Sequence, residues 1–137
     1  DMYYEVGTCD PISVFHNARI ENGLLTAGGP GHTVWLVYDT ALFTGGFAIH
    51  HAHAEATIVQ DASGIWVDQG IIAGALCPEE FASATAALTG SDTACVLPQL
   101  PAPDLEVGCD AQASPDGISM SFIFTGSPAR LVGFVQR

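Results

Sequence analysis

Glycine-rich turns divide the chain into short segments in which apolar residues alternate with polar ones. Residues 32–39, HTVWLVYD, and 47–60, FAIHHAHAEATIVQ, are rich in the β-branched and aromatic side chains that favour strands. Asn22 and Gly23 form the dipeptide most typical of a two-residue hairpin, because both tolerate a positive φ. The same pattern predicts further strands at 65–67, 70–76, 118–126 and 129–135.

One segment breaks the alternation. In PEEFASATAALTG, Pro78 stands where a first helical residue would, two acids follow in the first turn, and Gly90 provides the stop. These signals predict one short α-helix over about 78–89. Several short strands with one helix predict a mainly β fold, an antiparallel β-sandwich or flattened barrel. No linker divides the chain, so residues 1–137 are expected to form a single domain.

The charge of the chain restricts its partners. It carries 15 acidic residues against three arginines and no lysine, for a formal net charge of −12. Such a surface repels phosphate groups, so neither nucleic acid nor an anionic membrane is an expected partner. Hydrophobic residues make up 48% of the chain and charged residues only 13%, so we expect apolar surface patches. Patches of this kind serve a protein partner or self-association.

Four cysteines stand far apart, with no C-x-x-C pair. An even count in an acidic, lysine-free domain predicts two disulfides and an extracellular, cell-surface or periplasmic location. Three connectivities are possible. We favour Cys77 with Cys95, which bracket the predicted helix, and then Cys9 with Cys109; pairing of Cys95 with Cys109 across the proline-rich segment 90–117 is a close rival. Four free thiols in a cytosolic protein are the alternative.

A membrane-spanning segment and a signal peptide each have a recognisable sequence pattern. No apolar run is long enough to span a bilayer, and the opening DMYYEVG lacks the basic and apolar regions of a signal peptide. If the protein is exported, we expect that its targeting segment has been removed.

Three of the five histidines and a glutamate lie within six positions, 50–55. Strict strand alternation places His51, His53 and Glu55 on one face and His50 on the other, with the alanines. An H-x-H pair can hold a transition metal such as zinc or copper, with Glu55, His16 or His32 completing the site. His50 can join only if a β-bulge breaks the alternation. The alternative is a strand whose histidines have no metal.

Residues 45–53, GGFAIHHAH, resemble the start of the cupin metal motif, a glycine followed after five residues by H-x-H. The resemblance covers this short stretch only and implies a metal site at His51 and His53. Glu55 follows the second histidine sooner than the glutamate of that motif does. His32, in GGPGHTVW, could serve as a further ligand if folding places it next to His51 and His53.

A second candidate metal site lies in the loop DLEVGCDAQASPDG. Its oxygen ligands, of the type that calcium prefers, are Asp104, Glu106, Asp110 and Asp116. The loop lacks the close D-x-D-x-D-G register, and a solvated acidic loop is the alternative reading.

The last half of the chain contains GIIAGALCPEEFASATAAL and PDLEVGCDAQASPDGISMSFIFTGSPARLVG, where an aspartate- and glycine-rich loop precedes a final strand pair. In these features it resembles a family of uncharacterised exported bacterial lipoproteins. The resemblance implies export and a β fold, and no activity.

The sequence contains few of the motifs that would indicate an enzyme. There is no G-x-S-x-G elbow, and cross-linked cysteines could not serve as nucleophiles. The sequence therefore favours an exported structural or recognition module, as part of a larger cell-surface assembly. A metal-binding protein, or a metal-dependent enzyme, that uses the strand 51–55 is the alternative.

Overall fold

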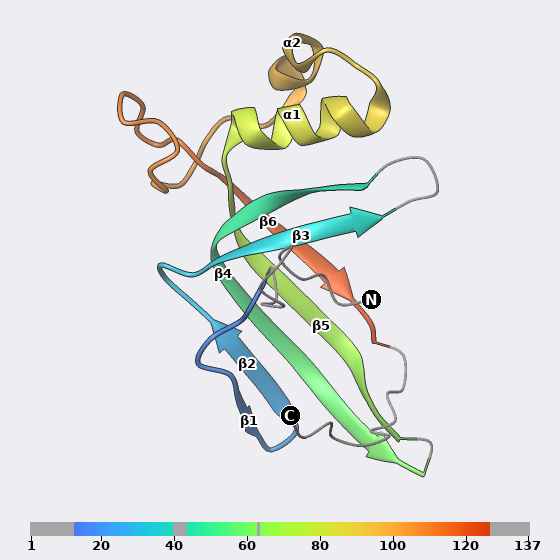
Figure 1. Cartoon of the computed structure of the whole chain (residues 1–137). Coiled ribbons are helices and arrows are strands. Elements are labelled where there is room, and N and C mark those ends of the chain that lie inside the picture. The colour runs from blue at the N-terminus through green and yellow to red at the C-terminus, as the bar shows by residue number, and fades with distance from the viewer. Residues whose placement is uncertain (1–12, 40–43, 63, 127–137) are drawn as a thin grey trace, which may run out of the picture.

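The computed structural model describes residues 13–39, 44–62 and 64–126, and within these ranges the chain forms one antiparallel sheet with helices at one end (Figure 1). The elements in chain order are β1 (Arg19–Glu21), β2 (Leu24–Gly28), β3 (Thr33–Asp39), β4 (Thr44–Asp61), β5 (Gly64–Leu76), α1 (Pro78–Thr89), α2 (Thr93–Val96), the 3₁₀ turn η1 (Leu97–Gln99) and β6 (Ile118–Phe124).

The strand order is β1-β2-β4-β5-β6, and β3 pairs with β4 as well. β4 is long enough, at 18 residues, to pair with two strands in succession. Thr44–His50 pair with β3, whereas His53–Thr57 pair with β2. Figure 1 shows β3 and the first part of β4 running across the direction of the other strands.

The prediction of a mainly β fold is confirmed, and α1 has the predicted bounds. All six described strands belong to a single antiparallel sheet that bends within β4 (Figure 1). The segment 90–117 contributes α2 and η1, so the helix α1 is not alone. The strand predicted at 129–135 lies outside the described residues.

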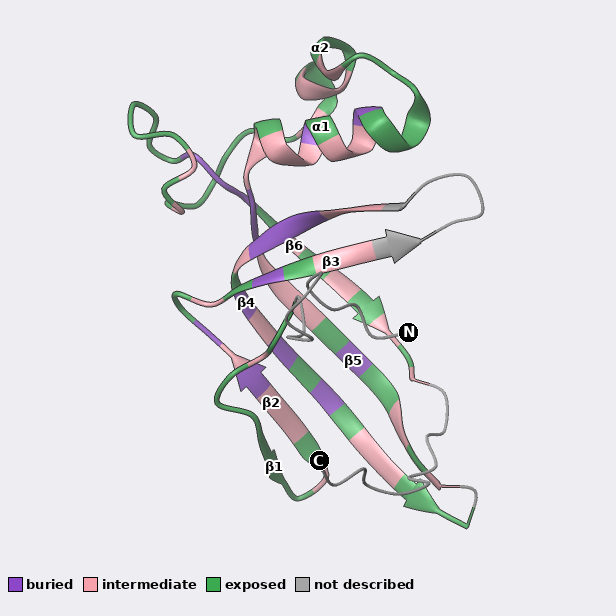
Figure 2. Cartoon of the chain, in the orientation of Figure 1, coloured by how far each residue is buried: buried purple, intermediate pink, exposed green. Residues whose placement is uncertain are grey.

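The core lies where the bend brings β3 and β4 towards β5, β6 and α1. Ile49 is fully buried, and Val34, Phe47, Ala52 and Leu76 complete the buried cluster (Figure 2). The ring of Phe47 contacts Phe81 of α1 edge-on at 5.2 Å and Phe122 of β6 at 5.9 Å between centroids. α1 is thereby attached to the sheet through aromatic packing, which contributes beyond buried area alone.

A β-bulge in β4 changes which side chains share a face. His50 pairs with Ala75 and His53 with Ala73, so two residues, His51 and Ala52, lie opposite the single Gly74. Because Ala73 and Ala75 are two apart on a strand, they share a face, and therefore so do His50 and His53. The alternation that placed His50 on the alanine face is wrong at this point.

The disulfide joins Cys77, directly after β5, to Cys109 in the loop before β6. The favoured pairing of Cys77 with Cys95 is wrong, and so is the pairing of Cys109 with either Cys9 or Cys95. A 12-residue helix places its two ends about 18 Å apart, which separates Cys77 from the segment that follows α1. The chain returns at Leu105, which bridges Gly117, and so carries Cys109 back to Cys77.

Candidate functional site

The three ligands predicted on β4 do not form one cluster. His53 Nε2 lies 3.0 Å from Glu55 Oε1, as a partly exposed pair on the sheet face opposite the core, which we call the outer face. His51 instead accepts a hydrogen bond at Nδ1 from the backbone N–H of Gly31, at 3.0 Å. A neutral imidazole that accepts at Nδ1 carries its proton on Nε2, so this arrangement leaves His51 without a free lone pair for a metal.

The additional histidines are also separate from that pair. His16 and His32 stack on each other, with ring centroids 5.4 Å apart. His32 Nε2 lies 3.4 Å from the amide nitrogen of Asn17. The set predicted from sequence, His51, His53 and Glu55 with His16 or His32, is therefore not assembled in this structure.

Among the described residues, one group of three metal-ligating side chains comes together, and it contains the histidine that alternation excluded. His50 Nε2 lies 3.4 Å from Cys77 Sγ and 3.7 Å from Glu80 Oε2, and the three ligand atoms are all within 4.8 Å of one another. On the other side of the ring, Nδ1 lies 3.4 Å from Thr33 Oγ1. All three members of the group are partly buried.

Each element positions one member of this group, which we call the His50 cluster (His50, Cys77, Glu80). The bulge turns His50 to the face of Ala75, and β5 continues along that face to Cys77. Pro78 starts α1 immediately afterwards, so Glu80 falls in the first helical turn. Glu80 Oε1 also accepts a hydrogen bond from the backbone N–H of Ala48, at 3.2 Å. The sequence signal for this cluster was the CPEE segment directly after a strand.

The acidic loop uses its carboxylates on its own backbone. Asp116 is only 5% exposed and accepts hydrogen bonds from the N–H groups of Val107, Gly108 and Asp110, at 2.7, 3.3 and 2.9 Å. The N–H groups of Asp110 and Val107 hold the pKa of the Asp116 carboxyl below its usual range. This network orders the loop around the disulfide.

The other predicted calcium ligands have partners of their own. Asp104 accepts from the hydroxyl and the N–H of Ser119, which lower its pKa. Glu106 accepts from the hydroxyl of Ser114. Asp104, Glu106, Asp110 and Asp116 therefore do not converge on one point in this structure.

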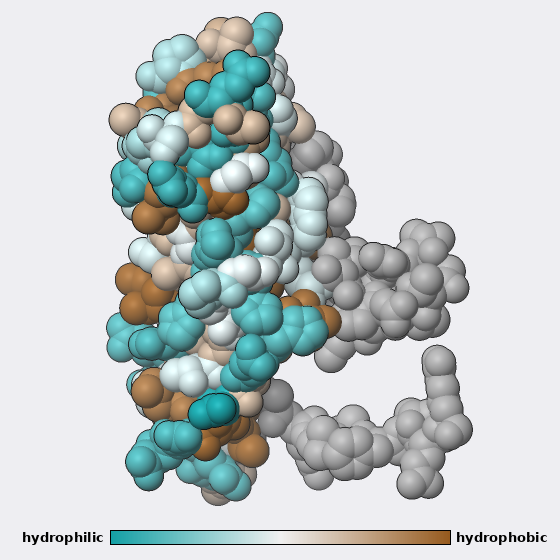
Figure 3. All heavy atoms as spheres, turned by 90° about the vertical axis from the view of Figure 1, so that its left-hand side faces the viewer, coloured by the Kyte–Doolittle hydropathy of each residue, from teal (hydrophilic) through white to brown (hydrophobic). Residues whose placement is uncertain are grey.

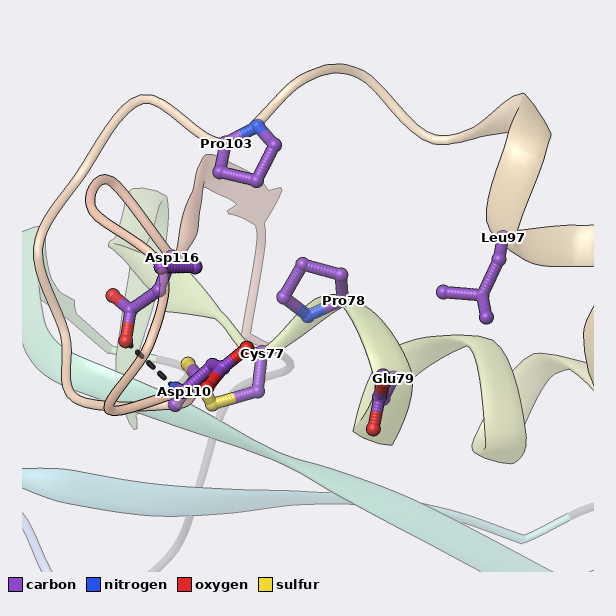
Figure 4. A pocket seen from close by; sticks show the side chains of 9 residues that line it. Cys77, Pro78, Glu79, Leu97, Pro103, Asp110 and Asp116 are labelled. Carbon is purple, nitrogen blue, oxygen red and sulfur yellow. Dashed lines mark hydrogen bonds between the residues drawn. A yellow bond between two sulfur atoms is a disulfide. The ribbon is translucent and has the colours of Figure 1, made fainter.

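A pocket of about 510 Å³ opens beside the disulfide. Its wall includes Cys77, Cys109, Glu79 and Asp116, and Figure 4 shows the sulfur–sulfur bond among the side chains that line it. The disulfide can therefore be approached from this side by a small molecule.

The outer face carries large apolar side chains in the open. Leu24, Ile71 and Ile123 are 46%, 42% and 73% exposed, and we call them the outer patch. Ile71 lies directly opposite Ile123 on one side and Glu55 on the other. A shallow hollow of about 180 Å³ is lined by Leu24, Glu55 and Ile71, among others.

The side of the molecule seen in Figure 3 shows how such residues are distributed: hydrophobic side chains form separate groups among hydrophilic ones.

Comparison with known proteins gives no family. No family model, no curated protein and no solved structure matches the chain. The resemblances to exported lipoproteins and to the cupin motif stay predictions. Within the described residues, none of the helices has the length and apolar character needed to cross a bilayer.

Proposed function

We propose that the protein is an exported recognition module that binds a protein partner through the outer patch. The observation that carries the proposal is the exposure of Leu24, Ile71 and Ile123 on one sheet face. A partner that covers the exposed part of these side chains gains roughly 25 cal/mol for each Å² of apolar surface removed from water. The disulfide between Cys77 and Cys109 supports an oxidising compartment.

Charge indicates which partner fits. The chain has a net charge of −12, so a second copy would meet strong repulsion, whereas a basic protein would be attracted. Glu55 lies opposite Ile71, beside the patch, and lines the same hollow as Leu24. The expected partner therefore presents a lysine or arginine next to apolar side chains. A basic side chain flanked by apolar ones on the partner would complement Glu55 and the apolar side chains of the outer patch.

The test uses an array of short peptides that pair one lysine or arginine with leucine or phenylalanine, and glutamate-containing versions of the same peptides. We expect the wild-type protein to bind the basic series and an Ile71→Ser, Ile123→Ser double variant to lose this binding. Ile20→Ser is the matched control, because Ile20 is 63% exposed and pairs with Leu25, away from the patch. Equal binding by the double variant and the wild type contradicts the proposal.

Sedimentation of the wild-type protein decides between a foreign partner and a second copy. A monomer over the whole concentration range agrees with the proposal. A dimer that the Ile71→Ser, Ile123→Ser variant abolishes means that the patch joins two copies of this chain, and the proposed basic partner is then rejected.

A further inference from the structure

The His50 cluster contains more than an ion pair between His50 and Glu80. Its third member, Cys77, is bonded to Cys109 in a disulfide. In the oxidised protein the sulfur of Cys77 is bonded to Cys109 and has no negative charge, so only His50 and Glu80 offer strong ligand atoms. Thiolate, imidazole and carboxylate together are ligands that zinc accepts. The cluster therefore has the composition of a zinc site with one ligand blocked.

The distances also fit a shared ion. Zinc lies about 2.3 Å from sulfur and about 2.0–2.2 Å from nitrogen or oxygen, so two ligands of a tetrahedral ion are roughly 3.4–3.6 Å apart. The Cys77 Sγ to His50 Nε2 distance is 3.4 Å, and the His50 Nε2 to Glu80 Oε2 distance is 3.7 Å. By contrast, His53 and Glu55 are in direct hydrogen-bond contact at 3.0 Å, with no sulfur beside them among the described groups.

The surroundings of His50 support the same role. Thr33 Oγ1 lies 3.4 Å from Nδ1 and can accept its proton, which leaves the lone pair on Nε2 facing Cys77 and Glu80. Metal-binding histidines commonly have such a partner on the second ring nitrogen. The hydrogen bond from Ala48 N–H to Glu80 Oε1 holds the carboxylate while Oε2 remains directed at His50.

We propose that His50, Cys77 and Glu80 form a zinc site that opens when the Cys77–Cys109 disulfide is reduced. A dithiol reductant reaching the pocket beside the disulfide gives up two electrons and two protons and becomes a disulfide itself. The bond between Cys77 and Cys109 breaks and each sulfur gains a proton. Zinc then displaces the proton of the Cys77 thiol, which is released to solvent. Cys109 is set free next to the ion and is available as a fourth ligand.

The experiment measures zinc affinity in full-length protein that carries Cys9→Ser and Cys95→Ser, so that only this disulfide can be reduced. Titration is done with the oxidised protein and again after treatment with a phosphine reductant, which takes its oxygen from water. We expect one zinc per chain in the reduced protein and binding about 100-fold weaker or absent in the oxidised one. Removing a group that only supports a ligand costs roughly 10- to 100-fold in affinity, so loss of a ligand should cost no less.

Variants locate the site. In the reduced protein, His50→Ala and Glu80→Gln should each weaken zinc binding, His50→Ala by about 100-fold. His53→Ala is the matched control, since it removes a histidine that is paired with a glutamate on the same strand. Cobalt in place of zinc should give the absorption of a tetrahedral ion with a thiolate ligand, and His50→Ala should alter that spectrum.

Two results overturn the proposal. The first is equal zinc affinity with the disulfide intact and reduced. The second is a reduced protein that keeps its affinity in the His50→Ala variant, because two thiols on an unfolded chain would bind zinc without His50. A Cys109→Ser variant in the same background frees Cys77 without any reductant. It must therefore bind zinc in air, and failure to do so counts equally against the site.

Discussion

At the scale of the residue, His51 departs from what strand alternation predicts. It has a φ of 52°, in the left-handed region that a side chain with a Cβ seldom adopts, because it is the extra residue of the bulge. Its ring compensates in part by accepting the N–H of Gly31. A residue that sequence alternation presented as a metal ligand is thus bound to the backbone instead.

Substitutions at His51 should separate the backbone strain from the hydrogen bond. His51→Ala keeps the strain and loses the bond, whereas His51→Gly loses the bond but removes the strain. We expect the free energy of unfolding of the alanine variant to be lower than that of the glycine variant by about 1 kcal/mol. Urea denaturation of both proteins measures this difference. If alanine proves as stable as glycine, the left-handed conformation is contradicted.

Asp116 should make the protein sensitive to acid. Its pKa is held below the usual range by backbone N–H groups, so its contribution to stability is complete above the pKa of the unfolded chain, about 3.9. That contribution is lost as the pH falls through the still lower pKa of the folded state. We expect Asp116→Asn to be less stable than the wild type at pH 7 and to show a smaller loss between pH 5 and pH 2.

Thermal unfolding followed across that pH range tests the effect. Asp68→Asn is the control, because Asp68 is an exposed carboxylate of β5 and lies outside the loop. A wild type and an Asp116→Asn variant with parallel pH profiles would show that the N–H contacts of Asp116 do not hold its carboxylate in the charged form.

At the scale of the element, sequence signals predicted correctly those features that depend on neighbouring residues in the chain, such as the bounds of α1. α1 has its predicted bounds because Pro78 fits the first turn and Gly90 ends the helix in a left-handed conformation, with a φ of 68°. The bulge in β4 depends on β5, a separate strand of the chain, and no local pattern of β4 records it. That is why the strand was predictable and the face of His50 was not.

Gly74 is the residue of β5 that makes the bulge possible. A Cβ at this position would lie 2.6 Å from the carbonyl oxygen of His50 and 2.6 Å from Cγ2 of Ile49. We expect Gly74→Val to lower the free energy of unfolding by roughly 1–3 kcal/mol, as overpacking of a core does. Ala73→Val, one residue away and facing the other side of the sheet, should cost less.

Chemical denaturation of the two variants gives the comparison, and the zinc affinity of the reduced Gly74→Val protein gives a second one. Because the bulge places His50 next to Cys77, a variant that removes the bulge should weaken the proposed zinc site as well as the fold. Equal stability of Gly74→Val and Ala73→Val would mean that β4 and β5 do not approach each other this closely at the bulge.

At the scale of the whole molecule, the disulfide links two segments that are far apart in the sequence but that the pairing of β5 with β6 brings to the same end of the sheet. The bond between Cys77 and Cys109, which are 32 positions apart in the sequence, closes a segment that includes α1 and α2, and it fixes the acidic loop beside the end of β5. Cross-links of this span typically stabilise a domain by about 2–4 kcal/mol. The count of cysteines predicted disulfides but could not choose their partners, because connectivity depends on the path of the loop 101–117.

Because Cys77 and Cys109 are bonded to each other, the state of the other two cysteines, Cys9 and Cys95, remains to be measured. Cys95 is exposed and pairs with no other described cysteine, and Cys9 lies outside the described residues. If all four cysteines are oxidised, the second disulfide can only join Cys9 to Cys95 within one chain. We expect no thiol to react with an alkylating reagent under native conditions, and peptide mapping without reduction to recover Cys77 linked to Cys109 and Cys9 linked to Cys95.

Mass spectrometry with and without reduction makes the measurement. Four reactive thiols would contradict export, whereas a single linked pair with Cys9 and Cys95 both alkylated would contradict only the second disulfide.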